Sequence, residues 1–222
     1  MRASRDLRIF SITPVKCLAH CKERLAPFLD AELHKELIFR MLGHVLNVLT
    51  KSSSLSGSVV VSPDSRILDF AADLGAYPLP EEDEVGVNGA VLRATEYCFK
   101  LGADATMVIP SDIALIREED IKELAILAQE GAEVVLTPSL RYDGTNALVR
   151  SPPDVIQTYY EKDSFFSHLK SALAKHLNTQ LYLSRSLMID IDSAEDIYEV
   201  RSIDRRIPSI DFFKTLPIKK AL

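Results

Sequence analysis

The sequence lacks the features that indicate a secreted or membrane-spanning protein. Its three cysteines, Cys17, Cys21 and Cys98, are an odd number without a CxxC pair, which argues against a disulfide framework or a zinc site and favours a reducing cytoplasm. No apolar run approaches the roughly 20 residues that a membrane span needs. The N-terminal stretch has no long apolar core and no small-residue cleavage site, so we expect no signal peptide. We therefore predict a cytoplasmic protein that does not engage a membrane.

Two phosphate-binding motifs are also missing. The absence of GxxxxGK[ST] excludes a P-loop, and the absence of GxGxxG removes the usual dinucleotide fingerprint. The formal net charge of −6 argues against a general nucleic-acid binder, although a local basic cluster could still bind a small anion. A chain of 222 residues, 47% of them hydrophobic, is long enough for one sizeable core, and we predict a single domain over residues 1–222.

Apolar periodicity alternates between strand and helix along the first part of the chain. We expect strands at Leu7–Thr13, Val59–Val61, Ala105–Ile109, Glu133–Thr137 and Ala147–Val149, and two strand-like runs at Gln180–Leu183 and Leu187–Ile191. We expect helices after the caps Asp30 and Ser193, after the turn Ser62–Asp64, and over Glu118–Glu130 and Phe165–Ala174. Gly86–Asn88 leads into a further helix that Gly102 ends. Pro14–Leu29 and Pro78–Glu84 are predicted loops, and Pro208–Leu222 has no clear element. The alternation predicts an α/β fold with a mostly parallel central sheet flanked by helices.

Three aspartates lie at predicted strand ends. Asp112 follows the apolar run Met107–Ile109, and in open α/β sheets ligands bind at the carboxyl ends of strands. Asp190 and Asp192 follow Leu187–Ile189, and side chains two residues apart on an extended chain point the same way. Mg²⁺ prefers such oxygen ligands together with substrate phosphates. The three carboxylates therefore form a candidate Mg²⁺ site; the alternative is that they are solvated or support turns and helix ends.

The stretch that follows the first strand is basic. Lys16, Lys22 and Arg24 lie within Pro14–Leu25, and several cations in one loop suit a triphosphate because they offset its charge. The alternative is a solvated loop that happens to be basic.

Two further segments could contact a ligand. Gly144–Leu148 combines a glycine with small hydrogen-bonding side chains, and Ser164–His168 resembles a helix start whose free N–H groups could bind an anion. An ordinary turn and an ordinary capped helix explain them equally well. His168 is interpreted as structural, and Asn88 as a helix cap that either does or does not also meet a nucleotide.

Taken together, these motifs resemble those of a known family, and the resemblance extends from about Ile12 to Ile203. The motifs are Pro14-Val15-Lys16, Lys22-x-Arg24-Leu25, Gly86-x-Asn88, Pro110-Ser111-Asp112, Gly144-Thr145-Asn146-Ala147-Leu148, Ser164-Phe165 and Asp190-Ile191-Asp192-Ser193-x-Glu195-Asp196. Their order and spacing resemble the 2-phospho-L-lactate guanylyltransferase family of coenzyme F-420 biosynthesis.

The resemblance implies a nucleotide-diphospho-sugar-transferase-like fold. It also implies transfer of GMP from GTP to a small phosphorylated three-carbon acid, 2-phospho-L-lactate or phosphoenolpyruvate, with release of pyrophosphate. It implies that Asp112, Asp190 and Asp192 bind the metal, that Lys16, Lys22 and Arg24 act at the triphosphate, and that Thr145 and Ser164 hold the acid. We further expect Pro14, Asn88 and Ser111 to contact the nucleotide and Asn146 to contact the acid.

The sequence departs from the family pattern at several of these positions. Cys17 replaces a proline, Glu23 replaces a serine beside the basic residues, and Glu161 and Asp163 stand where glycines are usual. Two extra acids near the site of an anionic substrate leave the exact acid open.

Two other functions remain possible from the sequence. Molybdopterin guanylyltransferases and sugar-phosphate nucleotidyltransferases of the same fold usually carry a Gly-rich first loop, which this chain lacks. A non-catalytic nucleotide-binding regulatory protein is the rival from another class, and pyrophosphate release would distinguish it from an enzyme. The apolar residues at the C-terminal end either pack on the domain or cover a second subunit of a homodimer; they are Ile207, Ile210, Phe212, Phe213 and Leu216.

Overall fold

The computed structural model describes residues 6–81, 86–203 and 208–217. These residues form a seven-stranded sheet of order β3-β2-β1-β4-β6-β5-β7. The strands are β1 Ile9–Pro14, β2 Gly57–Ser62, β3 Tyr77–Pro80, β4 Ala105–Val108, β5 Val134–Pro138, β6 Thr145–Arg150 and β7 Thr179–Leu181. Strand β6 is antiparallel to both of its neighbours, and the other neighbouring pairs run parallel. The predicted mostly parallel sheet is confirmed.

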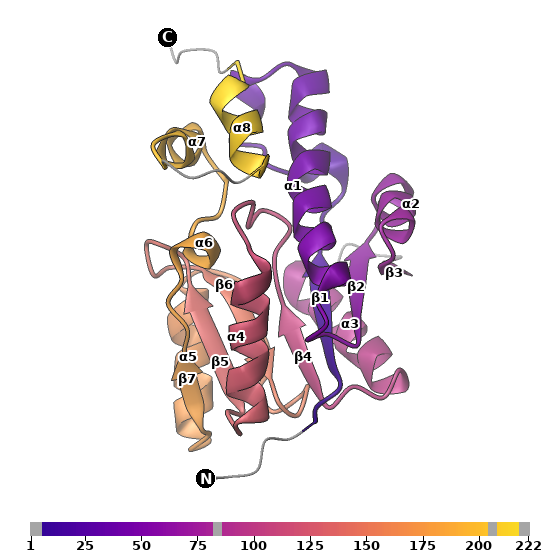
Figure 1. The fold of residues 1–222 in the computed structure, drawn as a ribbon, viewed down its shortest axis with the longest axis vertical. Helices are drawn as coiled ribbons and strands as arrows, with labels where there is room; N and C mark the ends of the chain where they lie inside the picture. The colour runs from indigo at the N-terminus through magenta and orange to yellow at the C-terminus, as the bar shows by residue number, and fades with distance from the viewer. Residues whose placement is uncertain (1–5, 82–85, 204–207, 218–222) are drawn as a thin grey trace.

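Helices cover both faces of this sheet, with α1 and α4 on one side and α3 and α5 on the other (Figure 1). They are α1 Ala31–Lys51, α2 Ser65–Asp73, α3 Gly86–Lys100, α4 Glu118–Gln129, α5 Ser164–Ala174, α6 Arg185–Met188, α7 Ala194–Arg201 and α8 Pro208–Thr215. The predicted loop after β1 contains two short 3-10 helices, Leu18–His20 and Ala26–Phe28. No helix in the described residues combines the length and the apolarity needed to cross a membrane.

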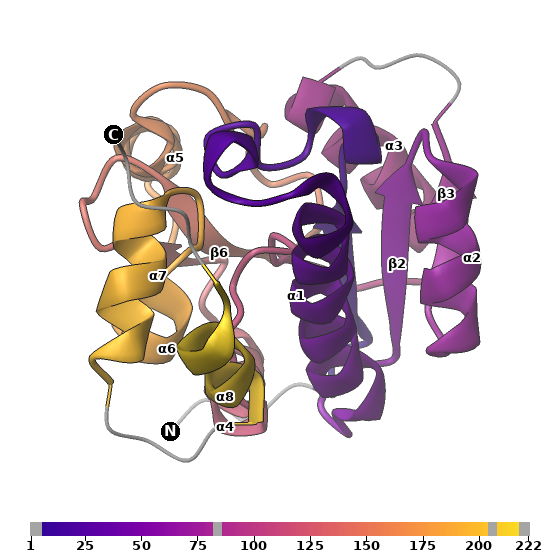
Figure 2. The ribbon, with the colours of Figure 1, turned by 90° about the horizontal axis from the view of Figure 1, so that it is seen from above.

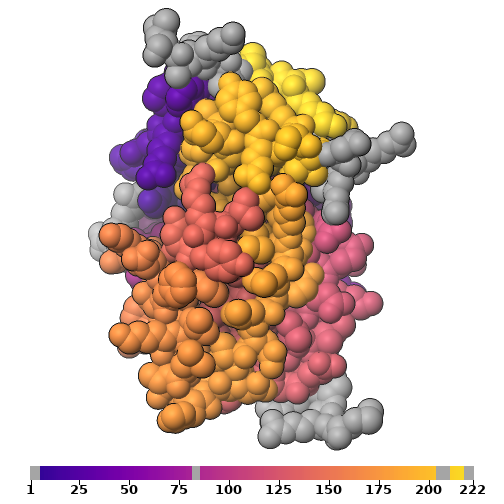
Figure 3. Space-filling view, turned by 90° about the vertical axis from the view of Figure 1, so that its left-hand side faces the viewer, coloured from indigo at the N-terminus to yellow at the C-terminus, as the bar shows by residue number. Residues whose placement is uncertain are grey.

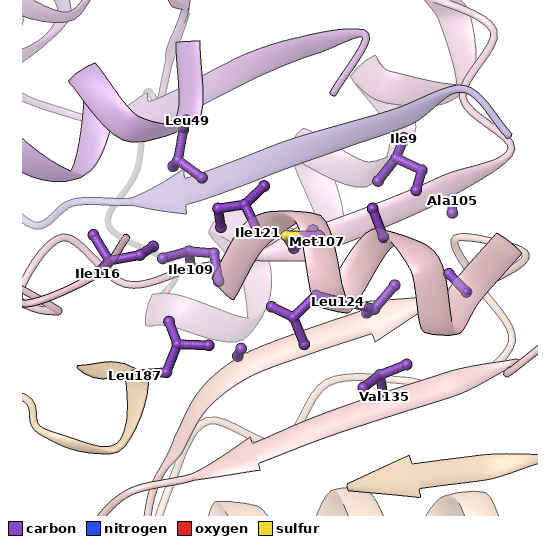
Figure 4. Packing of buried hydrophobic residues seen from close by; sticks show 14 of the residues in the cluster. Ile9, Leu49, Ala105, Met107, Ile109, Ile116, Ile121, Leu124, Val135 and Leu187 are labelled. Carbon is purple, nitrogen blue, oxygen red and sulfur yellow. The ribbon is translucent and has the colours of Figure 1, made fainter. Parts of the chain in front are cut away.

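Alternate residues of the central strands supply the core. On the α1 and α4 face, Ile9 and Met107 belong to the same buried apolar cluster as Leu49 and Leu124 (Figure 4). The intervening residues Phe10, Ile12 and Val108 face α3 and α5. Because successive side chains of a strand point to opposite faces, strands this apolar must be covered on both sides.

The predicted caps Asp30 and Ser193 are confirmed, whereas the prediction of Asn88 as a helix cap is wrong, because Asn88 lies within α3. The Asp30 carboxylate accepts a hydrogen bond of 2.9 Å from the Leu33 amide at the start of α1, and Asp64 accepts from the Arg66 amide at 3.1 Å in α2. At α7, Ser193 and Asp196 form the predicted capping box.

The predicted loop Pro78–Glu84 is wrong for its first residues, because Tyr77–Pro80 pairs with β2 as an edge strand. An edge strand tolerates proline, since a missing N–H that would face solvent leaves no partner unsatisfied. Residues 82–84 lie outside the described part of the chain.

The predicted strand Leu187–Ile191 is also wrong. Ser184 caps the short helix α6, and its carbonyl accepts from the Leu187 and Met188 amides. The backbone is extended again at Ile189. An apolar run of this length is consistent with a strand or a helix. The tertiary hydrogen bonds of Ser184, described below, favour the helix.

The C-terminal tail is not without structure, because α8 covers Pro208–Thr215. Phe213 and Leu216 are buried against residues of α1 and α7 of the same chain, which explains why the helix forms there. Of the two predicted alternatives, packing on the chain's own core is therefore the correct one for Phe213 and Leu216. Ile207 and the side chain of Ile210 lie outside the described residues, and the possible homodimer stays a prediction.

Candidate active site

An apolar cluster lies beneath the candidate site and joins segments that are distant in sequence. Leu25 of the loop after β1, Leu115 after β4 and Ile191 after α6 pack together with α1, α7 and α8. The Ile191 amide also donates a 3.2 Å hydrogen bond to the Asp112 carbonyl. Since each apolar residue lies within three positions of a predicted site residue, burying this cluster brings the charged groups to one edge of the sheet.

The loop after β1 arches over the carboxyl ends of the strands when the molecule is seen from above (Figure 2). Lys22 lies on this loop with a φ of 53°, in the left-handed region that few non-glycine residues adopt. Its carbonyl contacts the His34 Nε2 at 3.1 Å, which fixes this backbone. Its ammonium donates to the Asp112 Oδ2 at 2.5 Å and also to the Asp192 Oδ1. Lys22 therefore joins two of the predicted metal ligands.

The carboxylates influence one another's protonation. Burial and then the charge of Asp112 raise the pKa of Asp190 to about 6. Burial alone would raise the pKa of Asp192, but Lys22 holds it below its ordinary value. Burial would likewise lower the pKa of Lys22, but Asp112 and Asp192 hold it above its usual range. These opposing shifts show that three acids and one cation share one partly dehydrated space.

The donor chemistry of this cluster fits a hard divalent cation. The Asp112 Oδ1 is buried without a hydrogen-bond partner, and Asp190 and Asp192 contribute further carboxylate oxygens beside it. As the side chains stand, however, no three His, Cys, Asp or Glu groups among the described residues converge on one metal position. The Lys22 ammonium lies between Asp112 and Asp192, which accounts for this.

Asn146 positions a carboxylate in this structure. Its Nδ2 donates to the Asp190 Oδ1 at 3.1 Å and to the Leu187 carbonyl at 2.9 Å. Both protons of this buried amide are thus used to hold α6 and Asp190 in place. The predicted contact of Asn146 with the acid stays a prediction.

Sequence reasoning missed a buried carboxylate that holds the same segment. Asp120, in the first turn of α4, accepts hydrogen bonds of 2.6 Å from both the Ser184 and the Ser186 hydroxyls and one of 3.1 Å from the Tyr182 hydroxyl. It is fully buried, so these donors replace its lost hydration. The sequence signal was the alternation of Tyr182, Ser184 and Ser186 at the start of α6, but no local pattern identifies Asp120 as their partner.

A cavity of about 560 Å³ opens beside the carboxylates, lined by Pro14, Lys16, Lys22, Arg24, Asp192 and residues at the start of α3. The structure therefore brings together the three predicted cations and Pro14. Glu23, the acid that departs from the family pattern, also lines it and pairs with the exposed His20 at 3.2 Å.

Two residues that were predicted to contact the nucleotide, Asn88 and Ser111, are not among the residues that line this cavity. The Asn88 Oδ1 accepts from the Tyr160 amide at 2.8 Å and so ties α3 to the segment before α5. Ser111 is half-buried in the turn after β4, next to Asp112.

A second missed residue holds the basic loop on α2. The buried Asp64 Oδ2 accepts from the Leu18 amide at 3.2 Å and lies 3.6 Å from the Cys17 Sγ. Hydrogen bonds from Arg66 hold the pKa of Asp64 well below its usual range, so it is ionised and accepts strongly. Cys17, where a proline is usual in the family, thereby adds a donor to the anchor.

Thr145 and Ser164, from the start of β6 and the start of α5, meet in a buried chain of hydrogen bonds. The Ser164 hydroxyl donates to the Thr145 Oγ1 at 3.1 Å, and the His168 Nδ1 lies 3.0 Å from the same oxygen. The His168 Nε2 accepts from the Tyr159 amide at 2.8 Å, so the neutral ring carries its proton on Nδ1 and donates it to Thr145. Thr145 thus accepts two hydrogen bonds, and its own hydroxyl proton is available for a ligand.

The turn between β5 and β6 packs against α7, on the face shown in Figure 3. Arg141 pairs with Asp196 at 3.0 Å across this contact, beside a cavity of about 40 Å³ that Asp190 also lines. The Gly144 amide donates to the Ser139 Oγ at 3.0 Å, so this amide is used within the turn.

A mostly parallel sheet that carries acids and cations at the carboxyl ends of its strands matches the nucleotide-diphospho-sugar-transferase-like fold. A solved structure from Desulfovibrio desulfuricans, assigned to the nucleotide-diphospho-sugar transferases, superposes with a TM-score of 0.73 at 15% identity, covering 93% of this chain and 94% of that one. This likeness defines the fold.

The sequence comparisons define the family. The model for guanylyl transferases of the CofC type matches residues 9–220, so the chain belongs to this family and is a nucleotidyltransferase. A phosphoenolpyruvate guanylyltransferase of Rubrobacter xylanophilus is 33% identical over 86% of this chain and 92% of its own length. A 2-phospho-L-lactate guanylyltransferase of Methanobrevibacter smithii is 32% identical over 86% of this chain and 83% of its own length.

The burial of His168 predicts that acid destabilises the fold. Burial and then Arg150 lower the pKa of His168 to about 4, whereas the pKa of a histidine in the unfolded chain is about 6.5. Because the unfolded chain takes up the proton first, the contribution of His168 is complete above about pH 6.5 and is lost as the pH falls towards 4, by about 2 kcal/mol at pH 5. Urea unfolding at pH 7 and pH 5 measures this loss. His168→Asn should show a smaller loss between these two pH values, and an equal loss would contradict the assignment.

Proposed function

We propose that this chain transfers GMP from GTP to the phosphate of a small three-carbon acid, 2-phospho-L-lactate or phosphoenolpyruvate, and releases pyrophosphate, as a step of coenzyme F-420 biosynthesis in the cytoplasm. The observation that carries the proposal is the cluster of carboxylates Asp112, Asp190 and Asp192, of which Asp192 lines a basic cavity. The names of the relatives support guanine and the two acids.

The chemistry places modest demands on the protein. The attacking phosphate oxygen of the acid is already anionic, so no strong general base is required, and catalysis consists of positioning and charge neutralisation. Lys16, Lys22 and Arg24 line the cavity and would stabilise the departing pyrophosphate. Asp112, Asp190 and Asp192 would hold Mg²⁺, which when bound supplies positive charge to the phosphate oxygens of both substrates.

The acid would bind where β6 meets α5. The free hydroxyl proton of Thr145 can donate to an anionic oxygen, and the first amides of α5 around Ser164 add a partial positive charge. His168 does not contact the acid in this proposal. It orients the Thr145 hydroxyl by occupying one of its lone pairs.

A substrate screen tests the proposed reaction. With Mg²⁺ present, we expect pyrophosphate release with GTP plus 2-phospho-L-lactate or phosphoenolpyruvate, and much less with ATP, CTP or UTP or with either acid omitted. Release with a sugar 1-phosphate as acceptor would indicate another transferase of this fold. No release with any pair would favour a non-catalytic nucleotide-binding protein.

Removing a carboxylate tests the metal assignment. Asp112→Ala and Asp192→Ala should each lower kcat by at least about 100-fold, because the charge on the phosphates is then not neutralised. The exposed Asp69 offers a matched control, and Asp69→Ala should retain activity. Circular dichroism checks that both variants are folded. Near-normal turnover in both would overturn the metal assignment.

The Thr145 hydroxyl should contribute to binding of the acid and not to binding of GTP. Thr145→Val removes the free proton and should raise KM for the acid by about tenfold, the worth of one hydrogen bond to a charged group, while KM for GTP changes little. Thr145→Ser keeps the hydroxyl and should restore KM for the acid. Equal rises in both KM values would show that the substitution acts through general disruption of the site.

A further inference from the structure

Lys22 is held more firmly than a solvent-facing phosphate-binding lysine needs to be. Its side chain is 11% exposed, and its ammonium contacts the Asp112 Oδ2 at 2.5 Å and the Asp192 Oδ1. The ammonium thus donates charge-assisted hydrogen bonds to two carboxylates, and such bonds are stronger than those between neutral groups. Lys16 and Arg24 of the same loop are exposed instead and lower the pKa of Asp192 from further away, after the effects of burial and Lys22.

The position of this ammonium conflicts with metal binding by the same oxygens. Mg²⁺ requires carboxylate oxygens at about 2.0–2.1 Å in near-octahedral geometry. A lysine ammonium that bridges Asp112 and Asp192 occupies the space between them, and its charge repels a divalent cation placed within a few ångströms. The ammonium and the metal cannot both be bound to Asp112 Oδ2 and Asp192 Oδ1 at once.

We propose that Lys22 is the resident counter-cation of the carboxylate cluster, and that the lysine ammonium and the divalent metal are alternative occupants of one site. This inference rests on the proposed function, which supplies the metal. It gives Lys22 a second role: it neutralises Asp112 and Asp192 while the metal is absent, and it is released when the metal binds.

The released Lys22 side chain has a neighbouring cavity into which it can move. Lys22 itself lines the cavity of about 560 Å³ that Lys16 and Arg24 also line. The contact of its carbonyl with His34 holds the backbone, so the exchange needs rotation of the side chain alone. Phosphate groups in this cavity would offer the ammonium new partners. Metal and nucleotide should therefore promote each other's binding, as linkage requires.

Metal binding to the nucleotide-free full-length chain tests the exchange directly, with Mn²⁺ as the probe and electron paramagnetic resonance of the free ion as the readout. Lys22→Met keeps the length of the side chain and removes its charge, and we expect it to bind Mn²⁺ at least about tenfold more tightly than the wild type because nothing competes for the carboxylates. Lys16→Met removes the same charge from an exposed position of the loop and should change the affinity less than about threefold.

A measurement on the wild type covers the case in which Lys22→Met does not fold. Acetylation of Lys22 by acetic anhydride, followed by mass spectrometry, should be slow without metal because the ammonium is buried and paired. Saturating Mg²⁺ should raise its rate at least about threefold relative to Lys16 in the same molecule.

The possible results distinguish a failure of the proposed exchange from a failure of the proposed function. Equal Mn²⁺ affinity in the wild type and Lys22→Met, lost in Asp112→Asn, would leave the metal site standing and overturn the exchange. An equal tightening in Lys16→Met and Lys22→Met would overturn it too, since only overall charge would then matter. No Mn²⁺ binding by any variant would overturn both the exchange and the metal assignment.

Discussion

The contact of one lysine with two aspartates holds three distant parts of the chain together. Lys22, Asp112 and Asp192 belong to the loops after β1, β4 and α6, and the charges of the aspartates keep the pKa of the lysine high despite its burial. Such a network is stabilising only where each charge has partners, because burying an unpaired charge costs several kcal/mol. The apolar cluster directly beneath, with Leu25, Leu115 and Ile191, supplies the burial that brings these loops together.

The acids themselves are held by a further layer of polar contacts. Asn146 fixes Asp190, and Asp120 fixes α6 through the hydroxyls of Ser184 and Ser186. A carboxylate as deeply buried as Asp120 is tolerated because hydroxyl and amide donors surround it. These polar contacts keep Asp112, Asp190 and Asp192 close to one another, although burial and then the charge of Asp112 raise the pKa of Asp190.

Local sequence rules predicted much of this fold and parts of the site. The caps Asp30 and Ser193, the central strands and the meeting of Lys16, Lys22 and Arg24 in one loop all follow from patterns within a few residues. The short helix α6 was missed because its stability comes from Asp120, 64 residues away from Ser184. The insertion of Lys22 between two aspartates could not be predicted either, since it depends on contacts 90 and 170 residues apart along the chain.

The departures from the family pattern are accommodated around the carboxylates without altering them. Cys17 gives the basic loop a donor to Asp64 that proline could not provide, and Glu23 pairs with His20 at the exposed rim of the cavity. Asp163 adopts the left-handed conformation, with a φ of 55°, at the start of α5, a position where the usual glycine carries no steric cost. This strain lies next to Ser164, whose hydroxyl donates to Thr145. Cys17 and Glu23 therefore alter the contacts of the basic loop, whereas Asp163 alters the backbone next to the hydrogen bond between Ser164 and Thr145.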